Sequence, residues 1–389
     1  MIVGVPAETF PGEQRVALVP AVLPSLKKAS LEVLVQQGAG SKAGFPDAAF
    51  QEQGARLVGS RSELFSSSDI IVQVRSLGAN LEQEPPDLEL MRPRQVLVGL
   101  LNPLGDPQAA KALAARGVSG FAMELLPRIS RAQPMDVLSS MATIGGYKAV
   151  LLAASTLPKM FPMLMTAAGT VTPARVFILG AGVAGLQAIA TARRLGAVVH
   201  AYDVRPEVKQ QVESLGARFV ELPLESEQAA GAGGYARAMD EEFYRRQREL
   251  MARVMAESDV VISTAAIPGR RAPVLITRDM VSQMRPGSVI VDLAADSGGN
   301  CEATRPGETV EVNGVKVLGA VNVASTVPYH ASQMYARNVS AFLLNLVRDG
   351  QLRLNLEDPI IRDTLIVHQG EVTNPQVREL LGLPGGSPA

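Results

Sequence analysis

The sequence predicts an α/β protein made of two doubly wound, Rossmann-like domains separated by a cleft. Three observations predict it: short β-rich runs alternate with helical segments in the first third of the chain, the alternation restarts at Val176, and a glycine-rich turn follows that restart. With 389 residues, the chain is long enough for two domains of about 100–200 residues each.

In the first third of the chain, the predicted strands are separated by connectors that contain proline and glycine. They cover residues 2–5, 31–35, 70–74 and 95–99. This alternation favours a parallel sheet with helices on both faces.

After a long segment at residues 135–165, the pattern restarts. Strands are predicted at residues 176–179, 198–201, 260–263, 289–293 and 317–319, and a helix with one apolar face is predicted at residues 329–348. We expect the tail beyond this helix to return to the first domain. The first domain would then comprise residues 1–140 and 327–389, and the second residues 141–326.

The glycine-rich turn is the most informative local signal. Gly180 permits a tight turn, Gly182 lets backbone N–H groups approach a pyrophosphate, and Gly185 lets the next helix pack closely on the strand. Val183 and Ala184 belong to the start of that helix, whose positive dipole end favours an anion. Strand, glycines and alanine-rich helix occur in the right order, so we interpret the segment as a dinucleotide-binding unit rather than a plain connection.

Asp203 ends the next strand, where a carboxylate accepts hydrogen bonds from the adenosine ribose hydroxyls. The same carboxylate would repel a 2′-phosphate, so the sequence favours NAD(H) over NADP(H). Val204 follows it. Arg205 is discordant, because an arginine at this place can accommodate a 2′-phosphate.

A polar cluster precedes the apolar helical segment: Arg128, Gln133, Asp136 and Ser139. Such side chains can orient a carboxamide and a ribose, but none is an obvious proton carrier at neutral pH. The alternative is an ordinary loop in which Asp136 caps the next helix.

A dehydrogenase acting on an alcohol or amine also needs a general acid or base, usually histidine or lysine. The chain has three histidines. His200 is expected to be structural inside a strand and His368 lies in the tail. His330 is the only plausible candidate for a general acid or base, and we expect it to pack at a helix start instead.

Composition excludes several classes of protein. A net charge of −1 indicates neither nucleic acid nor an anionic membrane surface as partner, and the single Cys301 excludes an internal disulfide and a cysteine-rich metal cluster. The chain shows neither a signal peptide nor a run of about 18 apolar residues. We therefore expect a soluble, cytoplasmic protein with a buried thiol and no metal site.

The connector at residues 222–240 is long and has little apolar content. Loops of this length inside a compact domain are usually functional or disordered. A solvated insertion is one reading, and a lid hinged on its glycines with Tyr235 as contact group is the other.

Taken together, these passages resemble the NAD(H)-binding component of the proton-translocating nicotinamide nucleotide transhydrogenases over nearly the whole chain. The resemblance lies in residues 8–17, 128–136, 233–236, 264–273, 292–302 and 330–335. The family commonly has serine where this chain has Pro134.

The resemblance implies a role for each matching residue. The nicotinamide would be positioned by Arg128, Gln133, Asp136 and Ser139. The rest of the NAD(H) would be held by Gly180, Gly182, Val183, Ala184, Gly185, Asp203, Val204, Arg205, Tyr235, Thr264, Ala265 and Ala266.

Hydride transfer between two nicotinamides moves no proton at either carbon centre, which agrees with the missing acid. Positioning is then the main catalytic contribution, and it can account for roughly 7–11 kcal/mol of barrier. Only one glycine fingerprint of this kind is present, so NADP(H) is expected on a partner subunit.

The resemblance further implies a homodimer and membrane-embedded partner subunits in which proton translocation is coupled to the reaction. The chain would be the separately encoded soluble subunit, peripheral to the cytoplasmic face of the inner membrane through its complex.

Two other functions stay open. An alanine dehydrogenase-like enzyme would place a lysine and a histidine after the third and fourth strands of the first domain, where this chain has Arg75 and Asn102. Arginine is a poor proton carrier because its pKa exceeds about 12. A non-catalytic NAD(H)-binding protein is the other alternative, and the polar cluster around Gln133 argues against it.

Overall fold

The computed structural model describes residues 1–80, 84–221, 241–266 and 271–384. The chain divides into two compact units: unit 1 is Met1–Met141 with Ser325–Ala389, and unit 2 is Ala142–Ala324. The divisions expected from the sequence, after residues 140 and 326, lie within two residues of these.

Unit 1 contains an eight-stranded sheet in the order β19-β18-β6-β5-β4-β1-β2-β3. Its strands are β1 (Ile2–Val5), β2 (Glu32–Gln36), β3 (Arg56–Val58), β4 (Ile70–Arg75), β5 (Val96–Leu100), β6 (Ser119–Ala122), β18 (Leu365–His368) and β19 (Glu371–Val372). The six strands from β1 to β6 are parallel and form a doubly wound sheet whose order reverses between β1 and β4. Strands β18 and β19, from the C-terminal segment, are antiparallel additions at the β6 edge.

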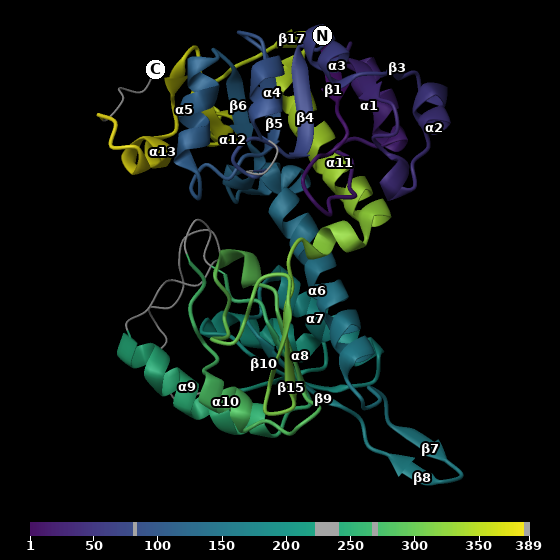
Figure 1. Cartoon of the computed structure of the whole chain (residues 1–389), viewed down its shortest axis with the longest axis vertical. Coiled ribbons are helices and arrows are strands. Elements are labelled where there is room, and N and C mark those ends of the chain that lie inside the picture. Colours follow the sequence, from purple (N-terminus) through teal and green to yellow (C-terminus); the bar gives the residue numbers. More distant parts are fainter. Residues whose placement is uncertain (81–83, 222–240, 267–270, 385–389) are drawn as a thin grey trace. The chain divides into compact units, whose positions relative to one another are not determined.

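Helices cover both faces of this sheet (Figure 1). One face packs against α1 (Leu23–Lys28) and α11 (Pro328–Leu346); the other packs against α3 (Arg61–Ser67), α5 (Pro107–Ala115) and α13 (Pro375–Leu380). The strands are apolar along their length, for instance Ile70, Ile71 and Val72 of β4, because both faces are buried. The remaining helices of unit 1 are α2 (Asp47–Glu52), α4 (Glu84–Leu90) and α12 (Pro359–Thr364).

Unit 2 contains a seven-stranded sheet in the order β11-β10-β9-β12-β13-β15-β14. Its strands are β9 (Arg175–Leu179), β10 (Val198–Tyr202), β11 (Arg218–Phe219), β12 (Val260–Ser263), β13 (Val289–Asp292), β14 (Thr309–Val312) and β15 (Val315–Gly319). All are parallel except β14, which pairs antiparallel with β15. The order reverses between β9 and β12, which makes the carboxyl ends of these two strands the place where such sheets bind ligands.

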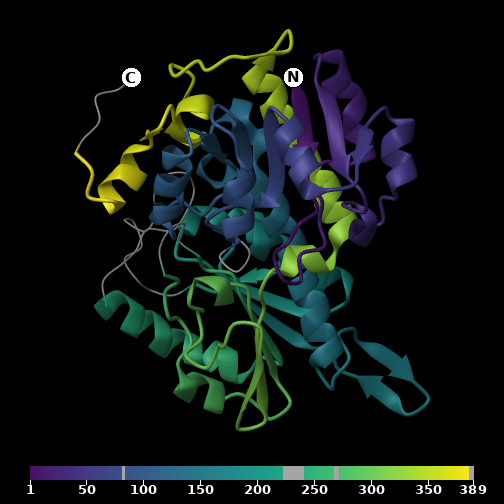
Figure 2. The same cartoon turned by 45° about the horizontal axis from the view of Figure 1, so that its top comes forward.

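The faces of this second sheet are covered by α6 (Val137–Thr156), α7 (Val183–Arg194) and α8 (Lys209–Ser214) on one side and by α9 (Glu241–Ala256) and α10 (Arg278–Ser282) on the other. A two-stranded hairpin, β7 (Leu164–Thr166) and β8 (Gly169–Val171), projects away from the sheet of unit 2 (Figure 2). The predicted α/β class with two doubly wound sheets is confirmed.

Helix α6 is long and apolar enough to cross a membrane by length and composition, with a mean hydropathy of 1.4, although it is not a continuous apolar run. Its residues Ala149, Val150 and Ala153 are fully buried in the apolar core of unit 2. This part of α6 therefore belongs to the core of unit 2.

The parallel sheet predicted for the first third of the chain is present in β1–β6, and the antiparallel pairs lie at the sheet edges, where β14 pairs with β15, β18 with β6 and β19 with β18. A two-residue turn explains the first of these. Asn313 and Gly314 both have positive φ, 48° and 79°, as a type I′ hairpin turn requires. A strand–helix alternation does not indicate such a hairpin, whereas these two turn residues do.

Candidate functional site

The glycine turn of unit 2 lies at the reversal point of the sheet. Gly180 follows β9 directly and has φ of 94°, in the left-handed region that favours glycine. Its N–H donates to the carbonyl of Tyr202, and the hydroxyl of Thr264 donates to the Gly180 carbonyl at 3.1 Å. The ends of β9, β10 and β12 are thereby fastened together.

Helix α7 begins just after this turn, with Gly182 as its N-cap residue. A Cβ at Gly182 would meet no atom within 4 Å, whereas one at Gly185 would lie 1.8 Å from the Gly180 carbonyl oxygen. Gly185 is therefore required for packing of the helix on the turn, and Gly182 leaves open space in front of it. The first N–H groups of a helix, here those of Val183 and Ala184, have no partner within the helix and can meet an anion.

The carboxylate of Asp203 is buried, and both of its oxygens accept hydrogen bonds. Its Oδ2 accepts the Ala181 N–H at 2.7 Å and Arg205 Nη2 at 2.9 Å, and its Oδ1 accepts Arg205 N and Nε, both at 2.9 Å. The predicted ribose ligand and the discordant arginine thus form one ion pair, the Asp203–Arg205 pair, with 8% and 9% exposure. Hydrogen bonding to Asp203 raises the pKa of Arg205 above its ordinary value.

Hydrogen bonds from Asn300 hold the segment that follows β12. Asn300 pairs with the main chain of Ala265 in both directions: its Oδ1 accepts the Ala265 N–H at 3.1 Å and its Nδ2 donates to the Ala265 carbonyl at 2.8 Å. Asn300 is in turn held by buried Asp292, whose Oδ2 accepts the Asn300 N–H at 2.7 Å. Ala266 follows and is exposed.

Sequence reasoning assigned no role to Asn300 and Asp292, although both lie in a passage with the family resemblance. The available signal was an aspartate at the end of a buried strand.

The polar cluster of unit 1 extends across a 3₁₀ turn, Ser130–Met135: Gln133 lies on the turn, Arg128 precedes it, Asp136 directly follows it and Ser139 is in the first turn of α6. Arg131 forms an ion pair with Asp358, Asn338 Nδ2 donates to the Pro134 carbonyl at 2.8 Å, and Ala132 is buried. The Asn338 bond uses the carbonyl of Pro134, which proline retains although it lacks a backbone N–H. The side chains of Arg128 and Gln133 remain exposed.

The remaining two members of the cluster bind each other. Asp136 Oδ1 accepts the Ser139 N–H at 2.9 Å and Oδ2 accepts the Ser139 hydroxyl at 2.6 Å, which caps the first turn of α6. The capping reading of Asp136 is therefore correct. The role of these residues in positioning a nicotinamide stays a prediction.

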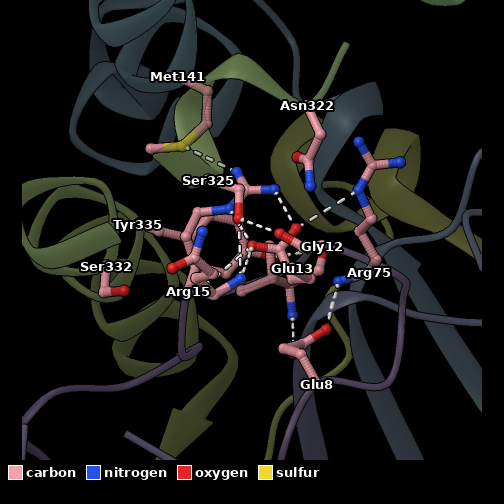
Figure 3. A network of polar contacts seen from close by, with 12 residues as sticks. Glu8, Gly12, Glu13, Arg15, Arg75, Met141, Asn322, Ser325, Ser332 and Tyr335 are labelled. Atoms are coloured by element: carbon pink, nitrogen blue, oxygen red, sulfur yellow. Dashed lines mark hydrogen bonds and ion pairs between the residues drawn. The ribbon is translucent and has the colours of Figure 1, made fainter. Parts of the chain in front are cut away.

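The reversal point of the unit 1 sheet holds a buried ionic network (Figure 3). Glu13 forms a bidentate pair with Arg15, with both N–O distances at 2.7 Å, and its Oε2 lies 3.6 Å from Arg75 Nε. The Arg75 guanidinium also lies over the Phe10 ring, 4.2 Å from its centroid. The Arg75 guanidinium therefore interacts with both the Glu13 carboxylate and the Phe10 ring.

Glu8 adjoins this network and accepts the Val74 and Arg75 N–H groups at 2.6 and 3.1 Å. Desolvation, reinforced by the negative charge of Glu13, raises the pKa of Glu8 to about 8. Burial alone would raise the pKa of Glu13 as well, but its bonds to Arg15 lower that pKa to about 2. The two carboxyl groups therefore titrate on opposite sides of neutrality.

Folding stability should consequently fall as pH rises from about 5 to 8. The Glu8 pKa is higher in the folded than in the unfolded chain, so the folded state retains a proton that the unfolded state releases across this window. Between pH 5.5 and 7.5, the free energy of unfolding should fall in the parent by at least about 1 kcal/mol more than in the Glu8→Gln variant. Urea unfolding at the two pH values checks this, and equal losses in both proteins would refute it. Burial also raises the pKa of Glu124, to about 7. The free energy of unfolding should therefore still depend on pH to some extent in both the parent and the Glu8→Gln variant.

His330, the one histidine considered as a proton carrier, and His368 of the tail each contact a neighbouring side chain. His330 is exposed at the start of α11, with its ring edge-on to Tyr329 at 5.3 Å, and His368 Nδ1 shares a hydrogen bond with the Ser119 hydroxyl at 2.8 Å. Cys301 is buried as expected, and burial raises its pKa to about 11. Tyr235 and the suggested lid lie outside the described residues.

Asn102 occupies the position where an alanine dehydrogenase-like enzyme would carry a histidine. Its φ is 48° and its N–H donates to Glu124 at 2.5 Å, at the end of β5. Neither Asn102 nor Arg75 can exchange a proton at neutral pH.

Comparison with known proteins gives consistent matches. The family models described as the N-terminal and C-terminal domains of alanine dehydrogenase/PNT match residues 4–145 and 149–375. A Rhodospirillum rubrum protein, named as one portion of an NAD(P) transhydrogenase subunit alpha, is 44% identical over 378 residues, covering 96% of this chain and 98% of that protein.

Solved structures agree with this. A transhydrogenase structure from Sinorhizobium meliloti is 41% identical with a TM-score of 0.83, covering 96% of this chain and 99% of that one. An L-alanine dehydrogenase structure is 29% identical with a TM-score of 0.82, covering 98% of this chain and 99% of that one.

Proposed function

Since this chain belongs to the alanine dehydrogenase/PNT family, we propose that it is the NAD(H)-binding subunit of a proton-translocating transhydrogenase. In this function it holds NAD(H) for direct hydride transfer to or from NADP(H) on a partner subunit. The similarity to transhydrogenase alpha subunits along almost the whole chain supports the proposal.

The observation that carries the proposal is the open glycine turn. The space in front of Gly182 and the helix start behind it suit a pyrophosphate, and Asp203, Thr264 and Ala265 border the same end of the unit 2 sheet. These residues fit a dinucleotide. The bound NAD(H) supplies the hydride, while Arg128, Gln133, Asp136 and Ser139 orient the nicotinamide end.

The alanine dehydrogenase alternative is disfavoured by the chemistry of unit 1. Oxidation of an amine requires a group that takes up a proton. Arg75, where that enzyme class would carry lysine, is paired with Glu13 and stacked on Phe10, and Asn102 has no titratable group. Hydride exchange between nicotinamides needs no such group.

We also propose a homodimer, associated through partner subunits with the cytoplasmic face of a membrane. The projecting hairpin supports self-association, because Met163 and Met165 are 60% and 84% exposed and methionine is adaptable at binding surfaces. Sedimentation equilibrium should give the mass of two chains, and a monomer at micromolar concentration would refute the proposed dimer.

The test is stopped-flow hydride transfer between NADH and an NADP⁺ analogue, with this protein mixed with the NADP(H)-binding component of a transhydrogenase. A fast burst that requires both proteins is the expected result. NADH binding without a burst would point to a binding protein without catalysis. Sustained NADH formation from alanine and NAD⁺ by this protein alone would establish the dehydrogenase instead.

A further inference from the structure

Helix α11 buries polar side chains as well as apolar ones. Ser332 and Tyr335 are fully buried, and Asn338 is 6% exposed. The Ser332 hydroxyl accepts the Val16 N–H at 3.0 Å, and the Tyr335 hydroxyl donates to the Gln73 carbonyl at 2.8 Å. These bonds reach the main chain of other segments of unit 1. Because a hydrogen bond requires a particular distance and direction, they fix backbone positions more closely than apolar packing does.

Asn338 makes the corresponding contact with the turn that carries Gln133. Its Nδ2 donates at 2.8 Å to the carbonyl of Pro134, the residue after Gln133. One hydrogen bond adds little net stability to a fold, but it sets the distance between the helix and the turn. We therefore expect Asn338 to matter more for the position of the turn than for the stability of the chain.

A second contact holds the same turn from the C-terminal segment. The Arg131 guanidinium pairs with both carboxylate oxygens of Asp358, and the distance from Nη1 to Oδ2 is 2.9 Å. Asp358 is itself held at the start of α12, where its Oδ1 accepts the Ile360 N–H at 2.9 Å. The turn is thus bound at Arg131 and at Pro134, on either side of Gln133.

We propose that Asn338, together with the Arg131–Asp358 pair, positions the Gln133 amide for hydride transfer without contacting the dinucleotide. The inference rests on the proposed function, since it takes Gln133 as a residue that orients the nicotinamide end. A displacement of about 1 Å in such a group can lower a rate roughly 100-fold. Affinity for NADH depends on contacts along the whole dinucleotide, so it changes little.

The decisive variant is Asn338→Leu, which removes the donor and keeps a side chain of similar size. Stopped-flow transfer at saturating NADH, with the NADP(H)-binding partner, should be about tenfold slower than in the parent, while NADH affinity stays within about twofold. The unfolding temperature should change by only a few degrees, because Pro134 is exposed and its carbonyl can bind water instead.

A double-variant cycle separates positioning from a general loss of stability. If Asn338 acts through Gln133, the combination of Asn338→Leu with Gln133→Ala should be no slower than Gln133→Ala alone. A further slowing of about tenfold in the double variant would overturn the proposal, because independent effects multiply. A transfer rate of Asn338→Leu equal to that of the parent would overturn it as well, and so would a parallel loss of NADH affinity.

If Asn338→Leu does not fold, Arg131→Gln decides, because the Arg131 side chain is 54% exposed and its replacement leaves the core intact. This variant should also transfer hydride more slowly with nearly unchanged NADH affinity, and a rate equal to that of the parent would overturn the proposal. A parent protein that binds NADH but transfers no hydride with its partner would instead refute the proposed function.

Ser340→Ala is the matched control. Ser340 is buried two residues further along α11, but its hydroxyl lies 3.4 Å from that of Ser25 and not at the turn. Its replacement should leave the transfer rate and the NADH affinity unchanged. A slowing equal to that of Asn338→Leu would show that any change within α11 lowers the rate, and would overturn the specific role of Asn338.

Discussion

The Gly182→Ala variant should unfold at the same temperature as the parent and bind NADH roughly a hundredfold more weakly, a loss of about 2.7 kcal/mol. The added methyl group meets no protein atom within 4 Å, and the φ of −75° at this residue is open to alanine. The methyl group would therefore fill only the space that a pyrophosphate needs for close approach to the backbone. Thermal unfolding and NADH fluorescence titration check the two halves of this prediction.

Gly185→Ala is the contrasting variant, three residues along the same turn. Its methyl group would lie 1.8 Å from the Gly180 carbonyl oxygen, so helix α7 must move away from the strand. Overpacking of this kind typically costs about 1–3 kcal/mol, which should lower the unfolding temperature by several degrees. Normal NADH binding by Gly182→Ala would contradict the assignment of the pyrophosphate to this turn.

The two variants separate what the fold requires from what a ligand requires within one motif. The glycine pattern predicts both roles from the sequence, because each glycine has a known place in a strand–turn–helix unit. It cannot show which glycine faces open space, because that depends on how α7 lies against the turn. The distinction between Gly182 and Gly185 emerges only from the packed structure.

Much of the fold follows from the spacing of apolar runs. Buried parallel strands read as continuous β-branched segments, so the sequence predicts β12 with its observed bounds and β9, β10 and β13 to within about a residue at each end. The hairpin of β18 and β19 is not predicted, because β19 has only two residues and both strands join the sheet by antiparallel pairing, outside the strand–helix alternation on which the prediction rests. Asn313 and Gly314 are turn residues that could have predicted the hairpin of β14 and β15 from the sequence. The prediction missed it because it followed the alternation of strands and helices.

The candidate site is predictable in position and less so in chemistry. The carboxyl ends of parallel strands meet at one edge of the sheet. The strand order therefore places three predicted site residues near one another where it reverses: Gly180, Asp203 and Thr264. The Asp203–Arg205 pair depends on a side-chain rotamer, which the sequence does not specify. In the sequence, Arg205 disagrees with a preference for NAD(H), because an arginine there can bind a 2′-phosphate. In the structure its guanidinium instead forms an ion pair with Asp203.

Gln133→Ala should slow hydride transfer roughly 10- to 100-fold while NADH affinity stays within about twofold of the parent, because misplacing a reactant by about 1 Å can cost this much in rate. The Gln133 side chain is exposed on a turn that Arg131, Pro134 and Ala132 hold in place. Its loss should leave the turn intact. Stopped-flow transfer with the NADP(H)-binding partner gives the rate, and NADH titration gives the affinity.

The measured pattern distinguishes orientation from anchoring. If Gln133 contributed mainly to binding, affinity and rate at low NADH would fall together, whereas an orienting amide lowers the rate at saturating NADH. Gln51→Ala, a change of the same size at an exposed residue of α2, should alter neither quantity. Because Asp136 caps α6, its replacement would change stability as well as rate. Gln133 is therefore the residue of this cluster at which positioning can be measured separately from folding.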